Sequence, residues 1–217
     1  MLALWVIMTI LSALVLGFGL GIRHATDTDH VVIVSTLLQR EPGVLRAASI
    51  AAWWGAGHTA TFFGLGLLIV VFGVRVPEGF ESCTQLLVAL LLLGFGSWHF
   101  FRALKVPEAA SKRAPKGGSA MRPVLVGVVH GLAGSAGIAL LASTTIPSRV
   151  LAVVYLGLFS IGTVIGMVLL TMVLSWPIGW TVRRQGNVRR AADVIASLFG
   201  IGFGAAVLVR FLIFGSI

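Results

Sequence analysis

The chain contains six apolar blocks, most of them long enough to form a helix that crosses a lipid bilayer. Such a helix needs about 20 predominantly apolar residues. Only 11% of the 217 residues are charged, whereas a soluble domain carries about 25%. The blocks cover approximately residues 2–37, 45–74, 82–101, 123–145, 150–177 and 191–214. We therefore expect an all-α polytopic membrane helix bundle, folded as a single transmembrane domain over residues 1–217.

The first apolar block has an unusual length. Its roughly 36 residues would make a continuous helix of about 54 Å, which far exceeds the ~30 Å hydrocarbon core. Two complete spans would need about 40 residues and a turn. We expect a broken or re-entrant element, with its break near the glycines of residues 17–21. The bundle would then have six spans with the N-terminus outside, or seven with the N-terminus inside.

Most of the positive charge lies in three short loops, at residues 39–46, 102–122 and 178–190, and the formal net charge is +9. Cytoplasmic loops carry an excess of Lys and Arg, so these loops are expected in the cytoplasm and the C-terminus outside. We expect a multi-pass protein of the cell (inner) membrane that binds no nucleic acid. The loop at about 102–122 contains Pro and Gly as well as Lys, which predicts a mobile segment.

Residues 23–30 place two histidines, two aspartates and an arginine inside the first apolar block. Ionisable groups at membrane depth are costly, so they usually line a substrate or ion path. Imidazole and carboxylate are also ligands of divalent transition metals. His24, Asp27, Asp29 and His30 are therefore the candidate ligands of a metal cation that crosses the membrane.

Two further histidines, His58 and His130, lie in other apolar blocks. Counting ~1.5 Å per residue from the nearest basic loop places them, His24 and His30 roughly 12–22 Å deep. We therefore expect these four side chains to converge. His99 lies beside Trp98 and two phenylalanines close to a basic loop, which is typical of an interfacial aromatic belt.

Helical phase favours Asp27 over Asp29 as the partner of these histidines. With about 100° per residue and His24 at 0°, Asp27 falls near about 300° and His30 near about 240°. Asp29 falls near about 140°, on another face. Either Asp29 serves a different partner, or the helix is unwound there.

Three segments resemble a known family. The run from His24 to His30 is similar to the H-x4-D-H signature of nickel/cobalt transporters, where it lies in an early membrane helix. Gly57-His58-Thr59 looks like that family's Gly-His-Ser/Thr motif. The stretch that begins at His130-Gly131 resembles the UreH-like branch, which is associated with nickel supply to urease. The resemblance implies metal-ligand roles for His24, Asp29 and His30, and then for His58; His130 is added on depth and composition.

The expected function is transport of a divalent transition-metal cation, Ni²⁺ or Co²⁺, as a transported ligand and not as a cofactor. The expected partners are that ion and the lipid bilayer. The sequence leaves open whether the chain forms a homo-oligomer. A proton-relay transporter of another substrate is one alternative, and an accessory membrane subunit without transport of its own is the other. We expect no enzyme, because H-E-x-x-H is absent and no Glu lies deep in a block.

Overall fold

The computed structural model describes residues 2–38, 43–77, 79–105, 120–133, 145–146, 148–183 and 187–214. Within these ranges every regular element is a helix, which confirms the all-α prediction. The elements are α1 (Leu2–His24), α2 (Thr28–Leu38), α3 (Val44–Phe72), α4 (Phe80–Lys105), α6 (Met121–Leu132), α8 (Arg149–Arg183) and α9 (Asn187–Phe214). By length and apolar composition, α3, α4, α8 and α9 can each cross a bilayer, whereas α2 and α6 are shorter apolar helices.

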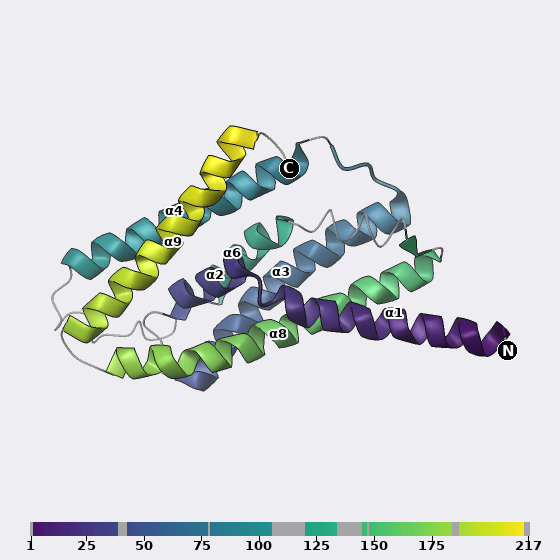
Figure 1. Ribbon diagram of the computed structural model, residues 1–217, viewed down its shortest axis with the longest axis horizontal. Helices are drawn as coiled ribbons and strands as arrows, with labels where there is room; N and C mark the ends of the chain where they lie inside the picture. The colour runs from purple at the N-terminus through teal and green to yellow at the C-terminus, as the bar shows by residue number, and fades with distance from the viewer. Residues whose placement is uncertain are drawn as a thin grey trace.

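The helices form two groups with α2 between them (Figure 1). In one group α3 packs against both α6 and α8, and α1 lies along α8. In the other group α4 and α9 form a pair. The short helix α2, whose first turn carries Asp29 and His30, contacts α3, α4, α8 and α9 and so lies at the centre of the bundle.

The first apolar block is broken, as its length predicted, but the break lies elsewhere. Helix α1 continues to His24 and α2 begins at Thr28, so the predicted break at residues 17–21 is wrong. The glycines there serve close packing, because a Cβ at Gly21 would overlap the backbone of Phe159 in α8. The helix ends in a tightened turn, where the backbone N–H of Thr26 and its hydroxyl both donate to the carbonyl of Arg23.

Several helix ends gather at one end of the molecule, which we call the basic end (Figure 1). They are the last turns of α2, α4 and α8 and the first turns of α3, α6 and α9. In the sequence these turns flank the three basic loops. Helices α1 and α2 both run toward the basic end, so the first block passes through the bundle once.

The loops are shorter than predicted. Helix α8 continues to Arg183, so residues 178–183 of the predicted third basic loop are helical, and α4 likewise continues to Lys105. Ile178 and Trp180 extend the apolar pattern of α8, and the helix passes through Pro177. Residues 106–119, most of the loop predicted to be mobile, lie outside the described residues, and their mobility stays a prediction.

Candidate metal centre

Four histidine side chains from four helices meet at the centre of the bundle. The ring centroid of His30 lies 4.6 Å from those of His24 and His130 and 5.1 Å from that of His58. The His58 ring lies 5.6 Å from His24 and 5.5 Å from His130. His30, His58 and His130 are buried, and the His24 side chain is 16% exposed. Depth counting predicted this convergence, and His99, on α4, is not among the four rings.

The break between α1 and α2 brings His24 and His30 together. On a continuous helix six residues would separate their Cα atoms by about 9 Å along the axis. Because His24 is the last residue of α1 and His30 lies in the first turn of α2, their rings instead meet edge to face at 73°. The irregular backbone is thus the feature that builds the site.

Each of the two aspartates contacts a histidine of the cluster. Oδ2 of Asp27 lies 2.8 Å from Nδ1 of His24. Oδ1 of Asp29 lies 3.1 Å from Nδ1 of His30, and its Oδ2 lies 3.3 Å from Nε2 of His130. Helical phase placed Asp27 correctly beside a histidine but was wrong in turning Asp29 away from them; the alternative expected for Asp29, an unwound helix, is what the structure has. The backbone is unwound at residues 25–27, so a constant angle per residue does not apply there.

Several buried ring nitrogens in this cluster have no hydrogen-bond partner among the described residues. They are Nε2 of His30, Nδ1 of His130 and both nitrogens of His58. A buried polar group left unpaired costs about 1–3 kcal/mol. A carboxylate that holds one ring nitrogen of a histidine leaves the other directed at a metal, which is the common arrangement in metal sites.

The donor atoms fall into two overlapping sets. One comprises His24, His30 and His58, the other Asp29, His30 and His130, and within each set the ligand atoms lie within 4.8 Å of one another. His30 belongs to both. Three imidazoles, or two imidazoles with a carboxylate, suit nickel, cobalt, zinc or copper. Chemically, the cluster can hold a divalent cation at either of two adjacent positions.

Two glycines of α6, Gly127 and Gly131, set the distance between His58 and His130. A Cβ at Gly127 would overlap the backbone of Trp54, and one at Gly131 would overlap that of His58. Helices α3 and α6 therefore touch backbone to backbone beside the cluster. The Trp54 ring, which the sequence interpretation missed, lies 5.5 Å from His30 and 6.1 Å from His130.

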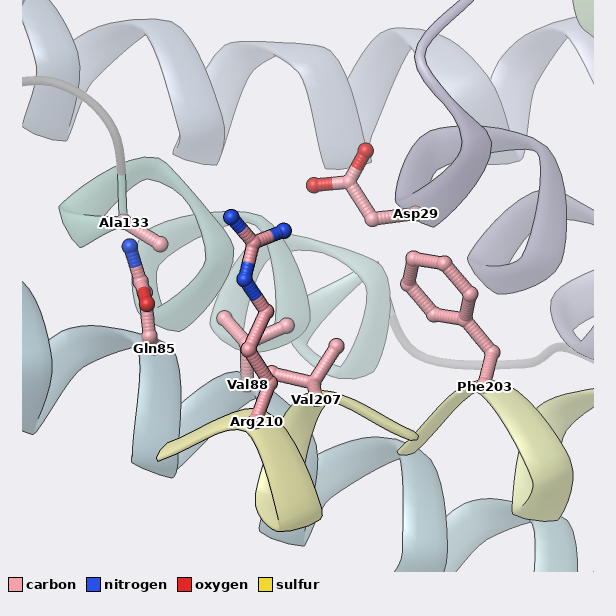
Figure 2. Close-up of a pocket in the computed structure, with 7 residues that line it drawn as sticks. All are labelled: Asp29, Gln85, Val88, Ala133, Phe203, Val207 and Arg210. Atoms are coloured by element: carbon pink, nitrogen blue, oxygen red, sulfur yellow. The ribbon is translucent and has the colours of Figure 1, made fainter. Parts of the chain in front are cut away.

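A pocket with a cavity volume of about 310 Å³ opens beside Asp29 (Figure 2). Gln85 of α4 and Arg210 of α9 contribute polar side chains to its lining. Sequence interpretation missed both residues. Arg210 carried a usable signal, because it is an ionisable residue inside the last apolar block.

Comparison with known proteins adds relatives that share most of this chain. It is 30% identical over 207 residues to the urease accessory protein UreH of Bacillus sp. strain TB-90, covering 89% of this chain and 91% of that protein. It is 27% identical to the Arabidopsis thaliana chloroplast protein FOR GROWTH AND FERTILITY 2, covering 89% of this chain and 55% of the relative. A shorter match of 75 residues, 27% identical, links it to the high-affinity nickel transport protein of Cupriavidus necator, covering 34% and 21% of the two chains.

No family model and no solved structure matches the chain. Two of these relatives are named as an accessory protein and a transport protein. The similarity to UreH extends over nearly the whole of both chains. The chain therefore belongs to the UreH-like family within the nickel/cobalt transporter superfamily.

Proposed function

We propose that this protein is a membrane transporter for a divalent transition-metal cation, Ni²⁺ or Co²⁺. The observation that carries the proposal is the buried cluster of imidazoles with unpaired nitrogens. In this proposal His24, His30 and His58 bind the cation through one ring nitrogen each. A buried set of neutral donors binds a dication in preference to the alkali cations, which favour oxygen ligands.

The two aspartates prepare the ring nitrogens for binding. Asp27 accepts from Nδ1 of His24, which leaves Nε2 of that ring as the donor to the metal. Asp29 does the same for His30, whose Nε2 is buried and unpaired among the described residues. His58 contacts no carboxylate, so either of its nitrogens is available. Both carboxylates add negative charge beside a positive ion.

The second set of donors gives the ion a place to move to. Because Asp29, His30 and His130 lie next to the first set and share His30 with it, an ion can pass between them without losing all its ligands. Conduction requires binding that is favourable enough for entry and sufficiently divided among sites for exit. In this proposal all six residues, His24, Asp27, Asp29, His30, His58 and His130, line one pathway.

The identity of the metal, the membrane location and the orientation in the membrane are each supported by a different observation. Nickel is favoured by the relatives, one named a nickel transport protein and another a urease accessory protein. The imidazole donors do not by themselves distinguish nickel from cobalt, zinc or copper. The multi-pass helices support a cell-membrane location, and the common position of the helix ends that flank the basic loops supports a cytoplasmic basic end.

The test is transport by the purified chain in liposomes that enclose a metal-sensitive dye. We expect Ni²⁺ influx with the wild-type protein and with His99→Ala, and neither binding nor influx with the double variant His24→Ala, His30→Ala. Unchanged binding by the double variant would contradict the site. Binding without flux would favour an accessory subunit, and pH-driven flux that chelators do not affect would favour a proton relay.

Anomalous scattering at the nickel absorption edge, from crystals soaked in Ni²⁺, would locate the ion directly. We expect a peak among His24, His30 and His58. A peak in contact with none of the four clustered histidines would overturn the proposal even if flux were observed.

A further inference from the structure

The pocket beside Asp29 is large enough for a hydrated cation. Its volume of about 310 Å³ corresponds to on the order of ten water molecules at ~30 Å³ each. A dication with a first shell of waters therefore fits. Its lining comes from three helices and a helix end: Asp29 of α2, Gln85 and Val88 of α4, Ala133 at the end of α6, and Phe203, Val207 and Arg210 of α9.

The pocket extends from Asp29 toward the end of the bundle opposite to the basic end. Phe203, Val207 and Arg210 follow one face of α9, over about 10 Å of helix rise, and Arg210 lies in the last turns of that helix. Gln85 lies in the second turn of α4. The start of α4 and the end of α9 lie side by side at this opposite end (Figure 1). Asp29 is thus at the inner part of the pocket, and Arg210 and Gln85 are at its mouth.

Asp29 and Arg210 are the two charged residues among the seven that line the pocket. Their carboxylate and guanidinium groups both point into the pocket and toward one another (Figure 2). The remaining lining is apolar apart from Gln85, so little polar surface separates the two charges. Attraction between opposite charges is stronger where low-dielectric walls replace water. A guanidinium does not deprotonate in proteins, so its charge is permanent.

We infer that Arg210 is a tethered cation that competes with incoming cations for Asp29 and thereby sets the selectivity of this pathway for divalent over monovalent ions. This inference rests on the proposed function, specifically on the set formed by Asp29, His30 and His130. Without metal, Asp29 contacts the imidazoles of His30 and His130, and Arg210 is the permanent positive charge in the same pocket. An arriving ion must compete with it.

The competition favours a dication that also binds imidazole. Such an ion binds two histidine nitrogens, and its double charge attracts the carboxylate of Asp29 about twice as strongly as a single charge would. Na⁺ or K⁺ offers only a single charge, which Arg210 already supplies. Arg210 is exposed and carries a long side chain, so it can turn toward the mouth of the pocket when the metal binds. It acts on the metal through Asp29 and binds no metal itself.

The test is calorimetric titration of Ni²⁺ into purified wild-type protein, Arg210→Gln and Arg210→Lys, each in NaCl and in choline chloride at equal ionic strength. We expect Arg210→Gln to bind Ni²⁺ about 3- to 30-fold more tightly in choline chloride, in line with common electrostatic couplings. In NaCl this gain should shrink, because Na⁺ then reaches Asp29. Arg210→Lys keeps the charge and should resemble the wild type in both salts.

Arg102→Gln is the matched control, since Arg102 is also exposed but lies near the basic end of α4. An equal gain in that variant, or no gain in Arg210→Gln, would overturn the inference. Ni²⁺ binding by His30→Ala separates a failure of this inference from a failure of the proposed function. If His30→Ala abolishes binding while Arg210→Gln matches the wild type, only the role of Arg210 is wrong. Wild-type protein that binds no Ni²⁺ overturns both.

Discussion

Oδ1 of Asp29 lies 3.1 Å from Nδ1 of His30, its neighbour in the chain. The same Asp29 oxygen also accepts from the backbone N–H of His30, at 3.0 Å. The other carboxylate oxygen lies 3.3 Å from the ring of His130, on a different helix. One carboxylate therefore fixes two imidazoles of the cluster, and its loss should be felt in both sets of donors.

Asp29→Asn should weaken Ni²⁺ binding by about 10- to 100-fold, the usual cost of removing a group that orients a metal ligand. The amide keeps the size of the side chain but has a single oxygen acceptor and no charge. Asp27→Asn should have the smaller effect, because Asp27 holds one ring and its side chain is 53% exposed, so water can replace it. Calorimetric titration of both variants checks this, and a larger loss in Asp27→Asn would contradict it.

His58→Leu should stabilise the metal-free fold while weakening Ni²⁺ binding, because only the set of Asp29, His30 and His130 is left intact. The substitution removes two buried nitrogens that lack partners among the described residues, each costing about 1–3 kcal/mol, and keeps a side chain of similar size. Unfolding in detergent, with and without Ni²⁺, measures both effects. The wild type should gain about 2.7 kcal/mol at a Ni²⁺ concentration 100 times its dissociation constant, and the variant clearly less at the same concentration.

His99→Leu is the control for that experiment, because His99 is not among the clustered rings. It should retain the stabilisation by Ni²⁺ in full. If His58→Leu lowers the stability of the metal-free protein, or is stabilised by Ni²⁺ as much as the wild type, the interpretation of His58 as a ligand that lacks partners in the metal-free protein is wrong.

Gly131→Ala should destabilise the bundle by about 1–3 kcal/mol and weaken metal binding, since the added Cβ would overlap the backbone of His58 and separate α3 from α6. Gly64→Ala, on α3, is the matched variant. A Cβ at Gly64 meets nothing within 4 Å, so this change should add roughly 0.5–1 kcal/mol of stability through helix propensity. Equal effects of the two variants on the midpoint of unfolding would refute this account of the α3–α6 contact.

Metal binding should weaken once the pH is low enough to protonate the ligand imidazoles. Protons and metal compete for the same imidazole nitrogens, so the form that binds metal dominates at the higher pH. Calorimetric titration of Ni²⁺ at a series of pH values measures this. A Ni²⁺ affinity that stays constant down to the pH at which the protein unfolds would argue against histidine ligands.

The helices were predictable from the sequence because apolar length has a direct physical counterpart in the thickness of a bilayer. The position of the first break was not predictable in the same way. A glycine-rich run serves equally well as a break or as a surface for close packing, and only the presence of α8 against Gly17 and Gly21 decides between them. The polar turn at residues 25–27 became the break instead.

The histidine cluster was predictable from depth, since four side chains at similar distances from one membrane face have few ways to avoid each other. The roles of Asp27 and Asp29 were not, because helical phase assumes an unbroken helix. Arg210 and Gln85 are far from the motif in sequence, so their place beside Asp29 depends on the packing of α4 against α9. The ligand roles themselves stay predictions for the experiments above.

The backbone contact between α3 and α6 affects which ionic radii the site can accept. Side chains adjust their rotamers to ions of different radius, but two helices that touch through Gly127 and Gly131 cannot move closer together. The span between the His58 and His130 rings therefore has a lower limit set by main-chain atoms. Discrimination among dications by radius would then be a property of the helix spacing, and it would survive exchanges of the ligating side chains.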